Sequence, residues 1–600
     1  MLIQKILFLS FLTLIISCST APEKSIDTVF EDYYQERLGF NPLESTFAGD
    51  ITYNDTLPNL FSDDYLDKLF SFYNKYEEIL KQYDASALTP EQSISRDVLL
   101  WTLNTKKLGL TNELPIVTSP QFGLPIIKIL PLNQIFSLHL FIAQLGSGSS
   151  AQPFETVEDY ENWLDRLDDF MDILYTSITN MEKGIELGVV HPTIIIERMI
   201  TQLDDFAKTP AEDHVFYTPI IQLPAEFSIE EKERLTSTYR EVLEEKLIPT
   251  FEELQNFLVD NYLPQGVASS GIGDLPYGKE TYEFLVRAHT STTMTPDEIH
   301  NLGLSEVARI ESEMEKVKDQ VGFNGDLKAF FDHVRNRNEL MPFTKPEQVI
   351  ANFEEMHERM KPQLELLFDQ TPKAGFVVRR TEAFREKSAS AEYNTGSKDG
   401  SRPGVFYVPI PNVTSYNIFS DESLFLHEAI PGHHYQLSLQ QENENLPSFM
   451  HAEGLGVYVE GWALYSESLG KELGLLTDPY QYFGMLSAEM HRAIRLVVDT
   501  GLHSKSWTRE QAIQFSLDHE AESEASITAE IERYMVAPGQ ALAYKIGQLK
   551  ILELRERAKV SLGDNFDIRE FHNQILNSGS LPLEILVRKI DGWIESKSNS

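Results

Sequence analysis

The sequence predicts a mainly α-helical protein of two lobes with one small β-sheet, and three observations support this fold class. Apolar residues recur at helical spacing over most of the 600-residue chain. Strand-like patterning is limited to 374–380 and 404–410. A loop rich in glycine, serine and proline at 264–276 separates an expected N-terminal helical lobe, residues 28–270, from a second lobe, residues 271–600.

The first residues of the chain predict a secretory signal and a lipid anchor. Residues 1–18 hold one lysine and an apolar run too short to span a bilayer, and they end at Cys18, the single cysteine. Residues 15–18 match the lipobox of bacterial lipoproteins, in which the cysteine carries diacylglycerol, and 19–27 would be a linker. Ser19 favours the outer membrane of the cell envelope, by resemblance to Gram-negative sorting rules. A plain secretory signal with an incidental cysteine is the alternative.

The composition argues against several classes of partner. The chain has 92 acidic and 51 basic residues, which gives a formal net charge of −41. This excess disfavours binding to nucleic acid or to anionic lipid through a basic surface, so we expect membrane contact only through the lipid anchor. One cysteine cannot form an intramolecular disulfide. The oligomeric state stays open.

Amphipathic periodicity justifies the helical assignment. The clearest helix start is at Thr295, which can cap a helix with Pro296 in its first turn and Glu298 completing a capping box. Helices are expected at 63–84, 155–187, 228–260, 296–320, 346–369, 479–505 and 508–535.

Residues 427–434 read HEAIPGHH and predict a zinc-dependent hydrolase. Neutral imidazole is a good ligand for Zn²⁺, and a carboxylate beside a ligand, here Glu428 after His427, can take a proton from water that the ion activates. The alternative is a helix that stops at Pro431 and leaves surface histidines without a metal.

The spacing of these histidines differs from the usual zinc-protease helix. In a regular helix His433 lies about 120° around the axis from His427, and His434 shares the face of His427 but lies about 10.5 Å further along. Pro431 and Gly432 mark a place where a helix can bulge. Two residues looped out there would return His433 to a ligand position, but the choice between His433 and His434 stays open.

A third ligand is expected in the segment 449–470, whose second half looks helical. Glu460 and Glu467 lie seven residues apart, near one helical face and among apolar neighbours. Glu460 is the candidate ligand. A glutamate that is solvated or paired with an arginine is the alternative.

These motifs resemble those of a bacterial family, the "domain of unknown function 885" proteins. Many members are predicted lipoproteins, and the family is grouped with the gluzincin zinc peptidases. Looser similarity extends over most of 28–595. The segments that carry the resemblance are HEAIPGHHYQ at 427–436, EGWALYSE at 460–467, RLVVDTGLH at 495–503 and RYMVAPGQALAYKIG at 533–547.

The resemblance implies a ligand set, a base and an architecture. Gluzincins hold Zn²⁺ with two histidines and a downstream glutamate, which correspond here to His427, His433 and Glu460, with Glu428 as the general base. Residues 271–600 would then be the zinc-binding catalytic lobe. The fold would be similar to neurolysin and carboxypeptidase Taq, with a small sheet beside the metal helix and a deep groove that admits short peptides.

Peptide hydrolysis also needs a donor to the oxyanion. Tyr534, next to Arg533, is similar to the Arg-Tyr pair near the zinc of angiotensin-converting enzyme. Tyr534 is therefore assigned to transition-state stabilisation, and Arg533 to its support or to binding of a substrate carboxylate. Tyr544 is the reserve donor. A buried tyrosine with a satisfied hydroxyl and an arginine in a surface pair are the alternatives.

Arg495, Asp499 and His503 follow each other at four-residue steps, which places them on one side of a helix. Asp499 is expected to orient His503 or a zinc-binding histidine, and Glu467 has a similar supporting role. His503 is a second candidate donor to the tetrahedral intermediate. A structural ladder of ion pairs is the alternative.

The segment GVFYVPI at 404–410 is expected to be an edge strand, because prolines follow it closely. Such a strand, which includes Tyr407, can align a peptide by strand addition. The preceding segment, 386–402, is rich in serine, glycine and charge and predicts a loop that closes over substrate, with Arg402 as its contact. A plain connection is the alternative.

The resulting prediction is zinc-dependent hydrolysis of short peptides by a lipid-anchored protein of the cell envelope. A rival hypothesis is a lipid-anchored protein that binds peptides or glycans without cleaving them. A second rival hypothesis is a zinc hydrolase that cleaves a different bond, such as an ester or a cell-wall amide.

Overall fold

The computed structural model describes most of the chain, and helices account for most of what it describes, which confirms the mainly α-helical fold class. The expected signal peptide and Cys18 lie outside the described residues. No helix in the described part is long and apolar enough to cross a membrane. The described residues are 24–119, 123–382, 386, 389–452 and 454–598.

The first part of the chain forms helices and one short antiparallel hairpin. The hairpin pairs β1 (Ile116–Thr118) with β2 (Pro125–Ile127). The helices are α1 (Ile26–Phe40), α2 (Pro42–Phe47), α3 (Asp63–Leu80), α4 (Pro90–Leu110), α5 (Leu138–Gly146), α6 (Val157–Leu187), α7 (Thr193–Lys208), α8 (Thr218–Ile221), α9 (Ile229–Val242) and α10 (Ile248–Phe257).

The second part of the chain carries the HEAIPGHH motif. Its helices are α11 (Gly278–Thr290), α12 (Pro296–Gln320), α13 (Leu327–Arg335), α14 (Pro346–Leu367), α15 (Asp421–Glu428), α16 (His433–Glu442), α17 (Ser448–Ala452), α18 (Gly456–Ser468), α19 (Pro479–Ser504), α20 (Arg509–His519), α21 (Glu524–Val536), α22 (Ala543–Leu562), α23 (Ile568–Leu576) and α24 (Leu583–Ser598).

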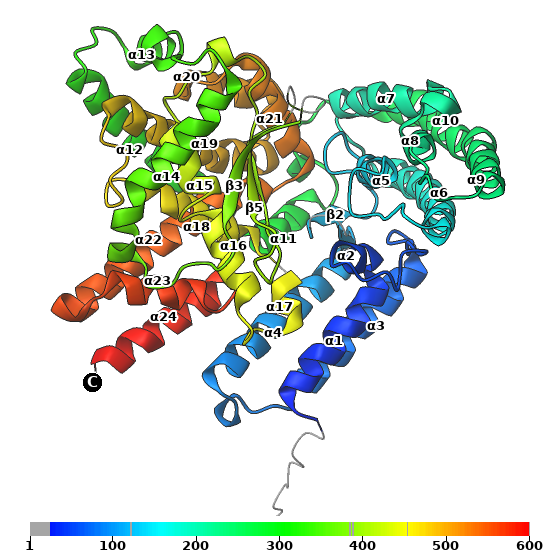
Figure 1. The fold of residues 1–600 in the computed structure, drawn as a ribbon, viewed down its shortest axis with the longest axis horizontal. Coiled ribbons are helices and arrows are strands. Elements are labelled where there is room, and N and C mark those ends of the chain that lie inside the picture. The colour runs from blue at the N-terminus through cyan, green and yellow to red at the C-terminus, as the bar shows by residue number, and fades with distance from the viewer. Residues whose placement is uncertain (1–23, 120–122, 383–385, 387–388, 453, 599–600) are drawn as a thin grey trace, which may run out of the picture.

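The helices gather in distinct groups. Helices α5 to α10 lie together on one side, and helices α11 to α24 form a larger body on the other (Figure 1). The first helices join the larger body, because α1 packs against α17 and α4 against α24. Phe30 and Phe449 meet there with ring centroids 5.5 Å apart. Residues from both ends of the chain therefore share one hydrophobic core.

Helix ends mostly follow the capping signals of the sequence. Thr295 accepts a hydrogen bond from the backbone of Glu298 and forms a capping box, and α12 then spans the expected 296–320. The expected helix at 508–535 is instead two helices, α20 and α21. The break arises because Ser523 caps a new helix by accepting from the Ser526 amide. The expected helix at 228–260 continues from α9 to α10 through a wide π-helical turn.

A three-stranded sheet lies beside α16, with strand order β3-β5-β4. It contains β3 (Phe376–Arg380), β4 (Glu392–Asn394) and β5 (Gly404–Val408), and β5 pairs parallel with β3 and antiparallel with β4. The expected edge strand at 404–410 is therefore the central strand, and that prediction is wrong. Pro409 does not interfere with pairing, because the strand ends one residue before it.

Two glycines set the distance between α18, which packs against the helices of the HEAIPGHH motif, and its neighbour α22. A Cβ atom on Gly461 of α18 would lie 2.6 Å from the Cα atom of Gly547 of α22. A Cβ atom on Gly547 would lie 1.9 Å from the carbonyl oxygen of Val457. The two backbones touch, so Glu460 on α18 and Tyr544 on α22 come from adjacent turns of two closely packed helices.

Candidate functional site

The HEAIPGHH motif is a broken helix. α15 ends at Glu428 and α16 begins at His433, and the residues between them fold back over the end of α15. Gly432 is required at this turn, because a Cβ atom there would lie 1.9 Å from the carbonyl oxygen of His427. The indole nitrogen of Trp462 donates to the carbonyl of Pro431 at 2.8 Å and holds the turn against α18.

The turn brings His433 beside His427, and α18 adds Glu460. One ligand-type atom from each of these residues lies within 4.8 Å of the others. The Nε2 atoms of His427 and His433 each lie 3.6 Å from Oε2 of Glu460. Donors about 2.1 Å from one tetrahedral ion lie about 3.4 Å apart, so the arrangement fits Zn²⁺. The carboxylate of Glu460 is the most accessible of the three, with 23% of its side-chain surface exposed.

Glu467 fixes the orientation of His427. Its Oε1 lies 2.8 Å from Nδ1 of His427, and its Oε2 accepts from the hydroxyl of Ser423. This contact holds the Nδ1 proton and leaves Nε2 facing Glu460. His433 has no such partner among the described residues, and its Nδ1 is buried without a hydrogen bond.

His434 points away from this cluster. Its Nδ1 lies 2.8 Å from the hydroxyl of Tyr393 and 3.3 Å from that of Ser438, and its ring packs on Phe376 of the sheet. Burial lowers the pKa of His434 to about 4, so this histidine is neutral. The geometry therefore brings His433, not His434, to His427 and Glu460.

The cluster has more negative than positive charge. The carboxylates of Glu428, Glu460 and Glu467 surround the two imidazoles. Burial opposes protonation of His427, but its contacts with Glu460 and Glu467 outweigh burial and raise its pKa to about 10. The site thus favours positive charge at this point. A divalent cation bound by two imidazoles and one carboxylate would supply that charge, so the residues fit a zinc ion.

Glu428, the predicted base, is the last residue of α15 and is 7% exposed. Its carboxylate makes no hydrogen bond within the described part of the chain, so it is not committed to a structural contact. Burial raises its pKa, and the nearby His433 and His427 oppose that rise. A buried carboxylate with a raised pKa next to a ligand is well suited to accept and return a proton.

Tyr534 does not have a free hydroxyl. It donates to Oε2 of Glu530 at 2.6 Å and accepts from Nε of Arg495 at 2.9 Å, and the side chain is 2% exposed. The hydroxyl proton of Tyr534 is already donated to Glu530, so the residue expected to donate to the oxyanion belongs to a structural hydrogen-bond network. This contact matches the alternative of a buried tyrosine with a satisfied hydroxyl.

Tyr544, the reserve donor, is better placed. It lies on the first turn of α22, is half-buried, and its hydroxyl makes no hydrogen bond within the described part of the chain. Burial and the negative charge of Glu460 raise its pKa, which keeps the proton on its oxygen. The guanidinium of Arg495 lies 4.6 Å from the ring centroid and holds the ring in place.

Asp499 and His503 support the backbone around Tyr534 instead of the metal cluster. Nδ1 of His503 accepts from the Ile272 amide at 3.0 Å, and Nε2 lies 2.9 Å from the Tyr534 carbonyl. Both ring nitrogens are occupied, so His503 is not placed to donate to a substrate. Asp499 accepts from the Gly539 amide and from a tyrosine hydroxyl, not from His503 or His427. The expectation that Asp499 orients a histidine is therefore wrong.

The predicted substrate-binding residues make contacts within the protein instead of facing a substrate site. Arg533 is committed to Glu530 and to Gln540, which its Nη1 contacts at 2.6 Å. Arg402 is exposed, and its Nη1 donates to the carbonyl of Thr395 at 3.1 Å within its own loop. Tyr407 sits on the central strand β5, half-buried, opposite Arg379 and Glu392 of its neighbours, so this strand has no open edge.

Sequence reasoning missed two side chains near the cluster. Ser423 precedes His427 by one helical turn and completes the hydrogen bonds of Glu467. Arg492 precedes Arg495 by nearly one turn of α19, and its positive charge opposes the rise in the pKa of Glu428. Their spacing from residues already singled out was the available signal, but neither belongs to a recognised ligand pattern.

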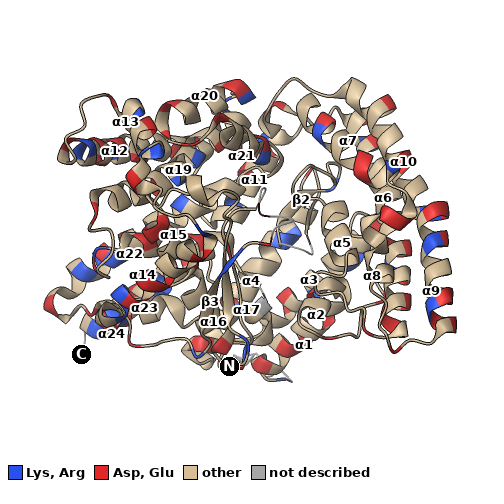
Figure 2. Cartoon of the chain, turned by 45° about the horizontal axis from the view of Figure 1, so that its top comes forward, with Lys and Arg blue, Asp and Glu red and all other residues tan. Residues whose placement is uncertain are grey.

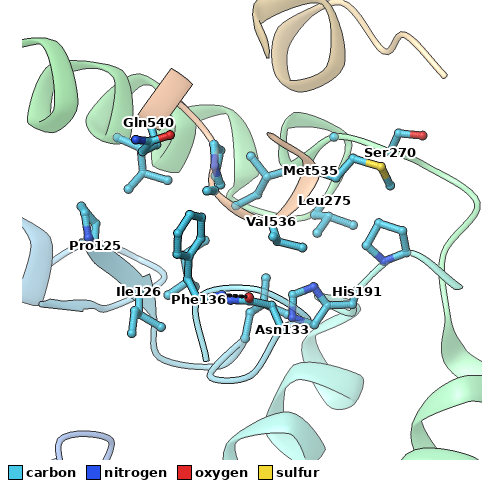
Figure 3. Close-up of a pocket in the computed structure, with 18 of the residues that line it drawn as sticks. Pro125, Ile126, Asn133, Phe136, His191, Ser270, Leu275, Met535, Val536 and Gln540 are labelled. Atoms are coloured by element: carbon cyan, nitrogen blue, oxygen red, sulfur yellow. Dashed lines mark hydrogen bonds between the residues drawn. The ribbon is translucent and has the colours of Figure 1, made fainter. Parts of the chain in front are cut away.

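A separate apolar cavity lies where segments of the first part of the chain meet segments of the second. Figure 3 shows His191 and Asn133 on one wall and Leu275 on the other. The cavity touches the region of Tyr534 through Gln540, which holds Arg533. Further side chains on its walls are Pro125, Ile126, Phe136, Met535 and Val536.

Comparisons with known proteins place the chain in a family. A search of curated proteins finds no match. A crystal structure of a "putative lipoprotein" from Colwellia psychrerythraea matches with a TM-score of 0.84 and 26% identity, covering 95% of this chain and 99% of that one. A "putative lipoprotein of unknown function" from Shewanella oneidensis shares the fold, with a TM-score of 0.73, 19% identity and coverage of 94% and 99%.

The family model described as "Bacterial protein of unknown function (DUF885)" matches residues 42–590, which is most of the chain. The chain belongs to this DUF885 family of bacterial proteins.

Proposed function

We propose that the protein is a zinc-dependent peptidase that cleaves short peptides and is anchored to the cell envelope through lipid on Cys18. The observation that carries the catalytic part is the convergence of His427, His433 and Glu460, with Glu428 buried beside them. The anchor is supported by the lipobox before Cys18 and by the similar structure from Colwellia psychrerythraea, which is described as a "putative lipoprotein". Placement in the outer membrane rests on Ser19 alone.

His427, His433 and Glu460 would hold the ion, and Glu467 would keep His427 in the binding orientation. When bound, Zn²⁺ supplies Lewis acidity, which makes water more acidic and a peptide carbonyl more electrophilic. Glu428 accepts the proton that water loses as its oxygen bonds to the carbonyl carbon. Glu428 then gives that proton to the amide nitrogen as the C–N bond breaks, which leaves a carboxylic acid and an amine. The second proton of the water passes from the acid to the amine, so the products are a carboxylate and an ammonium group. Tyr544 donates a hydrogen bond to the oxygen that becomes negative.

The test combines metal content with turnover on the purified full-length protein. Mass spectrometry should find one zinc per chain in the wild type and in His434→Ala, and none in His427→Ala, His433→Ala or Glu460→Ala. Wild type should cleave members of a panel of short peptides, lose that activity with a chelator and regain it with zinc. The panel also contains esters and muropeptides. Zinc binding with cleavage of these alone would reject a peptidase, and absence of zinc from every form would reject the proposal.

A further inference from the structure

Arg492 on α19 has a guanidinium group without an acidic partner among the described residues. Its Nη1 donates to the carbonyl of Ala488, one turn earlier, at a long 3.3 Å, and its buried Nε makes no hydrogen bond. A guanidinium group presents five N–H donors, and a buried donor left unpaired costs about 1–3 kcal/mol. The half-buried Arg492 is therefore arranged for a partner that the chain does not supply.

The neighbouring cations, in contrast, are already paired. Arg495 donates from Nη2 to Glu530 at 3.0 Å and from Nε to Tyr534, and it is only 7% exposed. Arg533 binds the same glutamate with Nε and Nη2. Nδ1 of His491 lies 2.6 Å from a carboxylate oxygen of Glu520. Arg495 keeps one buried nitrogen, Nη1, without a hydrogen bond, but its charge is paired, which leaves Arg492 as the arginine of this group with no acidic partner among the described residues.

Arginines gather on this side of the proposed site. Arg492, Arg495 and Arg533 contribute three guanidinium groups, and Glu530 pairs with two of them, Arg495 and Arg533. Glu428 lies within electrostatic range of Arg492, and Glu460 acts on Tyr544 together with all three arginines, so the region holds carboxylates as well as guanidinium groups. In a chain whose net charge is −41 and whose helices carry more acidic than basic side chains (Figure 2), Arg492 still pairs with no carboxylate of the described residues.

Arg492 lies on a helix that packs against the proposed catalytic residues' helix. Its helix, α19, packs directly against α15, which carries His427 and Glu428. Burial raises the pKa of Glu428, and Arg492 is one of the cations that oppose this rise. Arg492 also opposes the increase that burial causes in the pKa of Tyr544. Arg492 is therefore within electrostatic range of both the base and the candidate oxyanion donor.

We propose that Arg492 binds a carboxylate of the peptide substrate close to the scissile bond. The proposal rests on the peptidase function above and specifies its substrate class. Guanidinium and carboxylate groups form strong, charge-assisted pairs that are often bidentate, so such a contact fixes the peptide relative to Glu428. The carboxylate comes either from the free C-terminus of the peptide or from an acidic side chain beside the cleaved bond, and these two sources share the same chemistry.

The test uses the best-cleaved peptide of the panel, made again in three forms: free C-terminal acid, C-terminal amide, and C-terminal amide with a glutamate next to the cleaved bond. Wild type should cleave one carboxylate-bearing form with kcat/KM at least about tenfold above the neutral amide. Arg492→Met should remove this preference, mainly through a rise in KM for the acidic peptide, so that its kcat/KM falls to the value the same variant shows for the neutral amide. Arg492→Lys should retain part of the preference.

Arg234→Met is the matched control, since this arginine forms an exposed pair with Glu161 away from α19. It should leave the preference intact. A wild type that cleaves all three peptides equally, or an Arg492→Met variant that loses activity equally on all three, overturns the proposal while the peptidase function stands. If Arg492→Met does not fold, Arg492→Lys decides, because a preference identical to that of wild type in this variant overturns the role of Arg492 and a reduced preference supports it. A protein that cleaves no peptide overturns both.

Discussion

The carboxylate of Glu467 lies 2.8 Å from Nδ1 of His427, with both side chains almost fully buried. Because Ser423 donates to the other oxygen, the carboxylate cannot rotate without losing a buried hydrogen bond. Glu467→Gln should therefore weaken zinc binding by about 10–100-fold, since a partner of a ligand histidine sets both its orientation and its basicity.

Zinc affinity of this variant is measured by competition with a chromogenic chelator. Glu472→Gln is the matched control, because that glutamate lies five residues further on and pairs with Arg555 at the surface. A Glu467→Gln protein that binds zinc as tightly as wild type would contradict the role given to this contact.

Glu428 is expected to transfer a proton and not to bind the metal. Glu428→Gln should keep one zinc per chain and lower kcat by about 10²–10⁴-fold, because glutamine has no carboxylate to accept the proton from water. Metal content and kcat are measured on the same preparation, with Glu444→Gln on an exposed loop as control. Full peptidase activity in the zinc-loaded Glu428→Gln variant would exclude Glu428 as the base.

The two tyrosines should respond differently to loss of the hydroxyl. Tyr544→Phe should lower kcat by about 10²–10³-fold with little change in thermal stability, because the hydroxyl has no structural partner among the described residues. Tyr534→Phe should instead cost about 1–3 kcal/mol of folding stability, because Glu530 and Nε of Arg495 each lose a buried hydrogen bond. The reverse pattern of kcat and melting temperature would return the donor role to Tyr534.

Close contact between α18 and α22 predicts an effect of one methyl group. Gly547→Ala would place a Cβ atom 1.9 Å from the carbonyl oxygen of Val457, so the helices must separate. We expect a loss of at least about 1–3 kcal/mol in urea denaturation. Gly592→Ala on α24 is the control, because nothing lies within 4 Å of its added Cβ atom, and alanine there should be neutral or stabilising. Equal stability of the two variants would contradict this account of the packing.

The sequence predicted which side chains come together better than it predicted their surroundings. His427 and Glu460, which the structure brings together, were singled out because ligand chemistry restricts residue type strongly. The choice between His433 and His434 could not be made from spacing, because it depends on how far Pro431-Gly432 bulges the helix. A tertiary contact, the hydrogen bond from Trp462 to the carbonyl of Pro431, holds that bulge in place, and the sequence pattern does not reveal it.

The errors share a physical cause, which is that the sequence pattern does not identify tertiary partners. Asp499 and His503 lie on one helical side as expected, but each turns to the backbone of another segment, Gly539 and Ile272 respectively. The strand at 404–410 was assigned to an edge from its prolines, whereas the position in the sheet was decided by the short strand at 392–394. The local sequence predicted whether a segment forms a helix or a strand, whereas contacts between distant segments decided what each side chain does.

Asp499 predicts a pH dependence of stability. Its side chain is fully buried, and burial raises its pKa to about 7, although Tyr282 and Gly539 donate hydrogen bonds to it. An aspartate in the unfolded chain titrates near about 3.9. Between these values the folded protein keeps a proton that the unfolded chain has released, so this group makes the protein less stable as pH rises from about 4 to about 7.

Asp499→Asn should remove this contribution while keeping an acceptor for Tyr282, so its melting temperature should fall less than that of wild type between about pH 5 and about pH 7.5. Asp564→Asn, on an exposed turn, should follow wild type. The measurement is thermal unfolding at matched ionic strength across that range. Parallel curves for wild type and Asp499→Asn would show that Asp499 is already ionised in the fold, and that its contacts with Tyr282 and Gly539 outweigh the cost of burying its charge.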